Sequence, residues 1–122
     1  MSISINNIEE TTYHSLMRII HIFNITNFDF KFHESIFEIK LDDILIGVIN
    51  YNFLPSMRKN KIYIRNVYYN DSQYLDIIIK AVCEYFKDHL IITDIETNPI
   101  TEECVAVLRN NNFKGDKYIF YE

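Results

Sequence analysis

The chain has 122 residues, of which 48% are hydrophobic and 15% aromatic, a composition that favours one packed domain over residues 1–122 and excludes a disordered chain. Its formal net charge of −5 argues against non-specific nucleic-acid binding, because neutralising phosphates requires a basic surface. Since the sequence shows no apolar run of membrane-spanning length and no basic N-terminal segment followed by an apolar one, we expect no membrane association.

The N-terminal part begins with a predicted strand at residues 2–8, where polar and apolar residues alternate. Acidic and threonine residues at 9–12 favour a helix start, and apolar residues at helical spacing extend this helix to about Asn24. The stretch 25–35 mixes both periods, and we interpret it as a loop or a short helix.

Three strands are predicted next. The first two cover 36–41 and 44–54, and Asp42-Asp43 between them forms a tight hairpin turn. A connecting loop then leads to the third strand, at 61–69.

The clearest functional hint is the segment 61–88, which combines this third strand with a polar turn and an amphipathic helix. Asn70, Asp71 and Ser72 offer turn and N-cap chemistry, because their side chains accept from the first N–H groups of a helix. One apolar helix face follows, made of Leu75, Ile78, Ile79, Val82, Cys83 and Phe86. A strand that runs into a helix N-terminus can bind anions, since N–H groups and the helix dipole point outward together.

The C-terminal part is predicted to add a strand, a helix and a closing strand. The strand at 90–98 follows a helix and should therefore lie parallel to the strand before that helix. Thr101 is a good N-cap for the next helix, and Asn110–Asn112 end it. The closing strand is predicted at 117–122.

Neither the cysteines nor the histidines predict a reactive centre. Cys83 and Cys104 fall on apolar helix faces, which favours free buried thiols in a reducing cytoplasm over a disulfide or a nucleophile. His14 and His21 share a helix face but have no close companions of ligand type, so we predict no metal site.

The order strand, helix, hairpin, strand, helix, strand, helix, strand resembles the GNAT family of N-acetyltransferases, over most of the chain and best from Ile36 onward. In DDILIGVINY, Gly47 falls at the glycine of the family's hairpin. TEECVAVLRNNNF resembles the family's N-x-x-(A/S)-x-x-(V/F)-(L/Y)-x-x-x-G-F signature, with Thr101 at the Asn, Cys104 at the small residue and Leu108 at the Leu/Tyr. The resemblance implies an α/β, acyl-CoA N-acyltransferase fold, in which a mixed central sheet carries helices on both faces.

The resemblance also implies acetyl-CoA as the cofactor and an amine, on a small molecule or a protein, as the acceptor. The pantetheine arm would pair with the backbone of Asn66, Val67 and Tyr68. Thr101, which stands at the family's Asn, is a further cofactor-binding residue that the resemblance implies. The pyrophosphate would sit on the N–H groups of Ser72, Gln73, Tyr74, Leu75, Asp76 and Ile77.

The chain departs from the family at the pyrophosphate loop. The family pattern is Q/R-x-x-G-x-G/A, whose glycines let the backbone approach the phosphates, whereas residues 67–79 contain no glycine in any register. Asp71 and Asp76 would add negative charge beside a pyrophosphate. Arg65 and Asn66 stand on the strand where members often carry a catalytic Glu. The segment after Phe113 is short, so we expect a truncated closing hairpin.

Two functions therefore stay open. The first is a small acetyl-CoA-dependent N-acyltransferase. The second is a non-catalytic GNAT-like protein that has lost CoA binding and serves as a protein-interaction module. A homodimer formed through the sheet edge near the C-terminus is compatible with either function.

Other side chains are candidates for an acceptor site, each with a simpler structural role. Glu34 and Glu38 could act as a base, although an exposed strand carboxylate is the commoner role. Strand aromatics more often pack against neighbours than line a pocket. Those considered for a pocket are Tyr63, Tyr68, Tyr69 and Tyr74.

Overall fold

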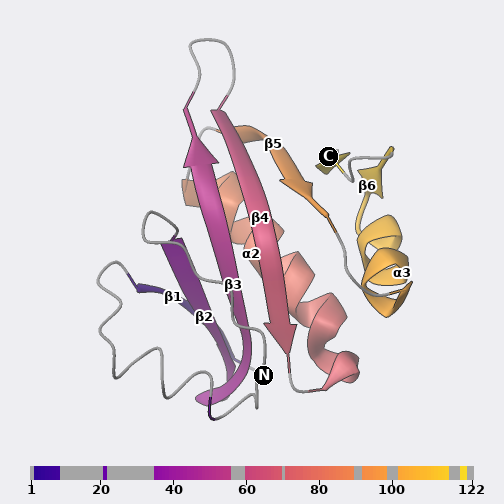
Figure 1. Cartoon of the computed structure of the whole chain (residues 1–122). Helices are drawn as coiled ribbons and strands as arrows, with labels where there is room; N and C mark the ends of the chain where they lie inside the picture. Colours follow the sequence, from indigo (N-terminus) through magenta and orange to yellow (C-terminus); the bar gives the residue numbers. More distant parts are fainter. Residues whose placement is uncertain are drawn as a thin grey trace.

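The computed structural model describes residues 2–8, 21, 35–55, 60–69, 71–89, 92–98, 102–115 and 119–120. Within these ranges the chain forms a seven-stranded sheet in the order β1-β2-β3-β4-β5-β7-β6, with α2 across one face and α3 beyond the end of β5 (Figure 1). The predicted helix at 9–24 and the segment 25–35 lie outside the described residues, apart from the exposed His21 and the start of β2 at Ser35.

The predicted hairpin of β2 and β3 is confirmed, and β1 and β4 extend it on either side by antiparallel pairing. Asp42 and Asp43 connect β2 to β3 with φ angles of 50° and 68°, the left-handed conformation that a two-residue hairpin turn requires. Ser2 and Asp42 exchange two hydrogen bonds of 2.8 Å that fix this turn against β1. The strands are β1 (Ile3–Ile8), β2 (Ser35–Leu41), β3 (Ile44–Leu54) and β4 (Asn60–Tyr69).

The predicted parallel crossover is confirmed, because β5 pairs with β4 in parallel after the intervening helix. Cys104 and Leu108 of α3 join the same buried cluster as the apolar face of α2. The elements of this half are the 3-10 turn η1 (Ser72–Tyr74), α2 (Leu75–His89), β5 (Ile92–Thr97) and α3 (Glu102–Asn110).

The C-terminal end differs from the single closing strand predicted at 117–122. Two short antiparallel strands, β6 (Phe113–Lys114) and β7 (Ile119–Phe120), form a hairpin, and β7 also pairs with β5. Asn112 has a φ of 70° and turns the chain sharply after α3, so the buried Phe113 enters the sheet at once. The hairpin is short, as expected, but it begins earlier than the sequence pattern indicates.

The main core lies between the sheet and α2. Leu75, Ile78 and Phe86 of α2 are 0% exposed, which confirms the predicted apolar face. On the opposite face of the sheet Ile36 and Val48 are also fully buried.

Both cysteines are buried and free, as predicted. Burial raises the pKa of Cys83 to about 12, and burial, followed by the charge of Glu103, raises that of Cys104, so both thiols stay protonated. Among the described residues, no helix has the length and apolarity that a membrane crossing needs.

Candidate active site at the divergence of β4 and β5

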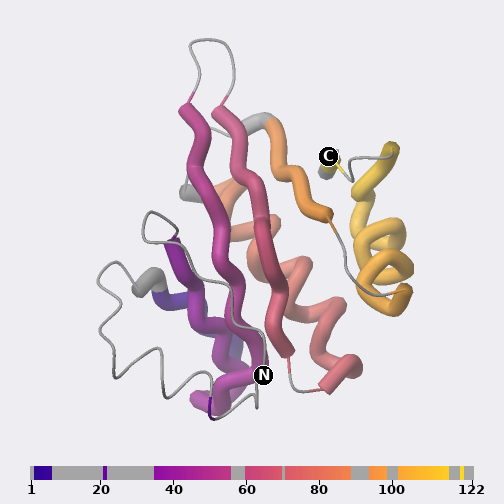
Figure 2. Tube along the Cα trace, viewed as in Figure 1, coloured from indigo at the N-terminus to yellow at the C-terminus, as the bar shows by residue number. Residues whose placement is uncertain are grey.

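The two parallel strands separate halfway along β4. Their ladder ends where Ile64 pairs with Thr97, and the buried Thr97 hydroxyl donates to the Ile64 carbonyl at 3.0 Å on this last rung. β4 continues alongside β3 to Tyr69, for roughly another 15 Å at the usual strand rise. The Cα trace shows β5 turning away from β4 towards α3 (Figure 2).

A β-bulge marks the point of separation. Ile64 pairs with Tyr51 of β3, whereas Asn66 pairs with Asn50, so Arg65 is an extra residue on β4. Because a bulge bends its strand and increases its twist, Arg65 helps to turn the end of β4 away from β5. The opening thus begins one residue after the last β4–β5 rung.

Beyond the end of β4, the N-terminus of α2 is capped by the chain itself. Asp71 accepts from the backbone N–H of Gln73 at 3.1 Å and from its side-chain amide at 2.8 Å. The N–H of Tyr74 donates to the Asp71 carbonyl, and that of Leu75 to the Ser72 carbonyl. The predicted cap is therefore present, and three amides of the predicted pyrophosphate position already donate within the turn.

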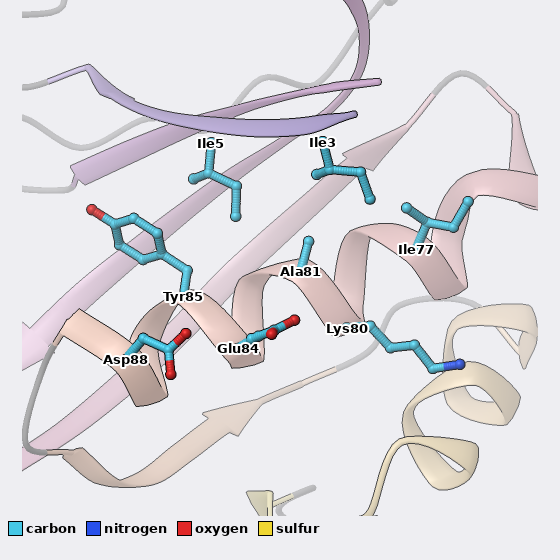
Figure 3. Close-up of a pocket in the computed structure, with 8 residues that line it drawn as sticks. All are labelled: Ile3, Ile5, Ile77, Lys80, Ala81, Glu84, Tyr85 and Asp88. Atoms are coloured by element: carbon cyan, nitrogen blue, oxygen red, sulfur yellow. The ribbon is translucent and has the colours of Figure 1, made fainter. Parts of the chain in front are cut away.

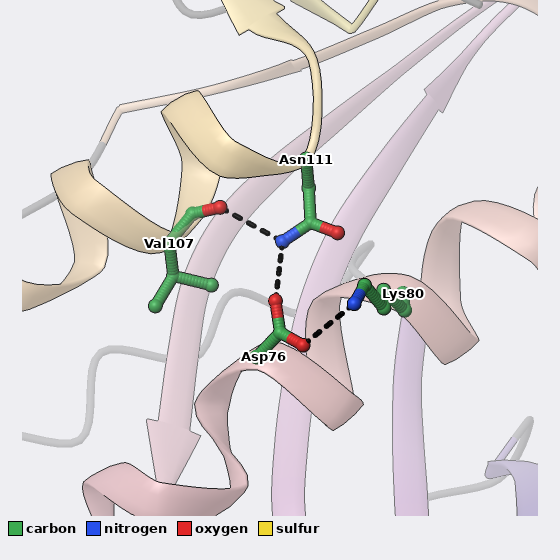
Figure 4. A network of polar contacts seen from close by, with 4 residues as sticks. All are labelled: Asp76, Lys80, Val107 and Asn111. Atoms are coloured by element: carbon green, nitrogen blue, oxygen red, sulfur yellow. Dashed lines mark hydrogen bonds and ion pairs between the residues drawn. The ribbon is translucent and has the colours of Figure 1, made fainter.

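Asp76, in the first turn of α2, ties this helix to the end of α3 (Figure 4). Its carboxylate lies 2.8 Å from the side-chain nitrogen of Asn111 and 2.9 Å from the Lys80 ammonium. The same Asn111 nitrogen donates to the Val107 carbonyl at 2.8 Å. Hydrogen bonds from Lys80 and then Asn111 lower the pKa of Asp76, so its charge is balanced inside the fold.

Because the pKa of Asp76 is lowered in the folded state, its contribution to the free energy of unfolding depends on pH. Its contribution is fully present above the unfolded-state pKa, near the usual 3.8, and is lost as pH falls through the lower folded-state value. We expect Asp76→Asn to cost about 0.5–1 kcal/mol of unfolding free energy at neutral pH, since the pair is partly exposed. Urea denaturation should show this difference shrinking below about pH 4. A difference that is constant across pH would contradict it, and Asp88→Asn, at the other end of α2, is the control.

A second polar contact links the end of β4 to α3. The Tyr69 hydroxyl donates to the carboxylate of Glu103 in the first turn of α3. Tyr69 and Tyr74 pack against the core on the α2 side, whereas the strand positions of Tyr63 and Tyr68 face the other side of the sheet. The four tyrosines therefore do not line one pocket.

The other predicted site residues are spread around this opening. Asn66, Val67 and Tyr68 lie on β4 past the last rung, and Ser72–Tyr74 form the turn beyond it. Leu75 is 0% exposed, so its side chain belongs to the core. Ile77 is half-buried against that core, and Thr101 lies outside the described residues.

The alternative candidates do not reach the opening. Glu38 lies on β2, which β3 separates from β4, and Glu34 and His14 are outside the described residues. In the described part of the chain, His21 is exposed and no group of His, Cys, Asp or Glu side chains is arranged to hold a metal ion.

Sequence reasoning missed a buried charge beside the split. Glu96, which precedes Thr97 on β5, is only 8% exposed and forms an ion pair with Lys61 of β4. In the sequence, Lys61 begins the predicted strand at 61–69 and Glu96 lies near the end of the predicted strand at 90–98. Only the β4–β5 register brings the two together, so no local pattern signalled the pair.

Two hollows lined by described residues lie away from this split. One of about 510 Å³ lies between β1 and α2, where Ile3 and Ile5 face Ile77 and Ala81 (Figure 3). A second, of about 470 Å³, lies between α2 and the end of α3 and includes Cys83 and Asn110–Asn112 in its lining. Neither contains the residues where β4 and β5 part.

The mixed sheet, the parallel β4–α2–β5 crossover and the divergence of its strands define a GNAT-like α/β fold. Solved structures support this class. YhhK of E. coli, solved bound to coenzyme A, is similar with a TM-score of 0.70 and 8% identity, over 98% of this chain and 96% of that one.

Two further structures extend the comparison. The N-acetyltransferase PseH of Campylobacter jejuni, in complex with acetyl coenzyme A, has a TM-score of 0.66 and 16% identity, over 98% of this chain and 95% of its own. A transcriptional regulator of Bacillus halodurans has a TM-score of 0.63 and 12% identity, over 94% and 95% of the two chains. No protein-family model and no curated protein sequence matches the chain. At these identities the comparisons establish the fold alone.

Proposed function

We propose that this domain is a small N-acyltransferase that moves an acetyl group from acetyl-CoA to an amine. The observation that carries the proposal is the parting of β4 and β5 after Ile64 and Thr97, which opens towards the N-terminus of α2. A strand edge followed by a helix N-terminus suits an elongated ligand with an anionic end. The ligands of the similar structures, coenzyme A and acetyl coenzyme A, support the same choice.

In this proposal the pantetheine arm lies along Asn66, Val67 and Tyr68, and the pyrophosphate lies at the turn formed by Ser72–Tyr74. The phosphates replace the Asp71 carboxylate as the acceptor for the Gln73 N–H, because both anions need the same donor. Buried free thiols are consistent with a reducing cytoplasm.

The chain's own groups must handle protons for such a transfer. An amine attacks only after its ammonium has lost a proton, and the leaving thiolate gains one. Leu108, at the position where many family members carry a tyrosine, is 0% exposed and packed in the core. It supplies no acid, so proton transfer depends on other residues.

Two observations favour a second candidate, a non-catalytic protein-interaction module. The Asp71 carboxylate already occupies the donor that a pyrophosphate would use, and residues 67–79 contain no glycine that would let phosphates come closer. The similar fold of a transcriptional regulator is in line with the rule that one fold serves several functions.

Calorimetric titration with acetyl-CoA and with CoA separates the two candidates. We expect micromolar binding by the wild type and, for Asp71→Ser, binding about 2–5-fold tighter, because serine keeps a neutral cap and removes the competing charge. Asp88→Ser removes the same charge near the C-terminal end of α2 and should leave the affinity unchanged. If millimolar ligand gives neither heat nor thermal stabilisation, the acyltransferase is rejected and the interaction module is supported.

A further inference from the structure

We infer that the outer edge of β1 and the hollow beside it form a docking surface for an extended, basic segment of another protein, which adds a strand to the sheet. The surface lies at the β1 end of the sheet, and β2 and β3 separate it from the split between β4 and β5. The inference therefore does not rest on the proposed acyltransferase.

The outer edge of β1 carries backbone groups that can pair with a further strand. Within the described residues, β1 is the last strand of the sheet. The Asp42 N–H donates to the Ser2 carbonyl at 2.8 Å, and hydrogen-bonded pairs alternate along an antiparallel ladder. The backbone groups of Ile3 and Ile5 therefore point away from β2. Such a row of N–H and C=O groups is the template for adding a strand to a sheet edge.

The side chains of the same two residues form one wall of the hollow between β1 and α2. Ile3 and Ile5 face Ile77 and Ala81 across it (Figure 3). Because side chains alternate between the two faces of a strand, every second side chain of a strand added beside β1 would enter this hollow. Its volume of about 510 Å³ leaves room for them.

Apolar exposure continues from the hollow across the end of the sheet. Ile3 pairs with Leu41, and Leu41 pairs with Ile44, so the three side chains project to the same face. Ile3 is 42% exposed and Ile44 is 67% exposed. The exposed turn residues Asp42 and Asp43 lie between Leu41 and Ile44. An exposed apolar patch with a polar rim is typical of an interaction site.

The charges around the hollow favour a basic partner. Glu84 and Asp88 are exposed on α2 and line the hollow. Among the lining residues that the structure describes, the one cation is Lys80, and it is already paired with Asp76. The rim is therefore acidic, and an arginine or lysine of the added strand would be attracted to it.

Two nearer occupants match this rim less well. A second copy of the chain brings a net charge of −5, which acidic groups on the rim repel. The chain's own continuation after β1 starts with two further acids, Glu9 and Glu10. A separate basic segment is the occupant that the charges select.

A peptide of defined sequence tests the docking surface on the full chain. The probe is fluorescein-labelled, amidated Thr-Arg-Thr-Val-Thr-Arg-Thr, which presents the same side chains in either strand direction. We expect fluorescence anisotropy to give a Kd of about 100 μM or tighter. The peptide with Glu in place of Arg should bind at least ~10-fold more weakly. The version N-methylated at every residue keeps the charges but has no backbone N–H donors, so it should not bind.

Charge reversal on α2 locates the binding site. Glu84→Lys should weaken binding of the basic peptide by ~10-fold. Glu102→Lys makes the same change of charge at an exposed position of α3 and should leave the affinity within about 2-fold of wild type, because exposed charges that far away are screened. Circular dichroism confirms that both variants fold, and the comparison of the three peptides requires no variant.

The oligomeric state separates this partner from a second copy. We expect the wild type to sediment as a monomer. No binding of the basic peptide at about 1 mM, equal binding of the acidic or N-methylated peptide, or equal losses in Glu84→Lys and Glu102→Lys would overturn the docking surface. A wild-type dimer that Ile3→Glu converts to a monomer would also overturn it, in favour of a second copy on this face.

Discussion

Replacing Phe37 with alanine should cost about 3–5 kcal/mol of unfolding free energy, a large part of the 5–15 kcal/mol typical of a domain. Phe37 is 1% exposed on β2 and lies at the centre of an aromatic cluster. Its ring centroid is 4.6 Å from that of Tyr51, 4.8 Å from Tyr85 and 5.2 Å from Phe86. The rings come from β2, β3 and α2, so the cavity left by Phe37→Ala would loosen the sheet from the helix.

Urea denaturation followed by circular dichroism measures this loss as a lower midpoint at an unchanged slope. Phe53→Ala is the matched control, because Phe53 lies on the neighbouring strand but is 43% exposed and should change stability by less than about 0.5 kcal/mol. Similar losses for the two variants would show that the aromatic cluster does not hold α2 to the sheet.

The elements around the site were predictable because their patterns are local. The apolar residues of α2 recur at helical spacing, and six of them, from Leu75 to Phe86, are buried against the sheet. Asp42-Asp43 predicts a two-residue turn, and both residues adopt the left-handed conformation. The parallel pairing of β5 with β4 follows from the helix between them. Each of these features is decided within a short window of sequence.

The polar contacts of the candidate site could not be predicted, because they join residues that are far apart in the sequence. The sequence identifies Asp71 as a cap. Its hydrogen bond with the Gln73 N–H becomes relevant to the proposed CoA binding only once the structure shows that β4 and β5 separate ahead of this turn. Asp76 looked like an unfavourable charge until the fold brought Asn111 beside it. The buried ion pair of Glu96 with Lys61 became visible only through the β4–β5 register. The sequence thus shows the charged and polar side chains of the candidate site, whereas their partners depend on tertiary structure.

A methyl group at Gly47 would disturb the packing of α2 against the sheet. A Cβ there would lie 2.6 Å from the terminal carbon of Ile78, 3.1 Å from its Cγ1 and 3.4 Å from the Tyr68 carbonyl. Ile78 is 0% exposed, so its side chain has little room to move. We expect Gly47→Ala to cost ~1–3 kcal/mol, the usual range for overpacking a core.

A double-mutant cycle with Ile78→Val identifies the cause. Valine lacks the carbon at 2.6 Å, so Gly47→Ala should cost less in the Ile78→Val background than in the wild type, with a coupling of about 0.5 kcal/mol or more. An equal cost in both backgrounds would refute the steric explanation. Gly47 on β3 pairs with Tyr69 at the end of β4 and faces Ile78 of α2. The same clash would therefore displace α2 relative to the end of β4. In the proposed acyltransferase, the affinity for acetyl-CoA should therefore fall in Gly47→Ala and recover together with stability in the double variant.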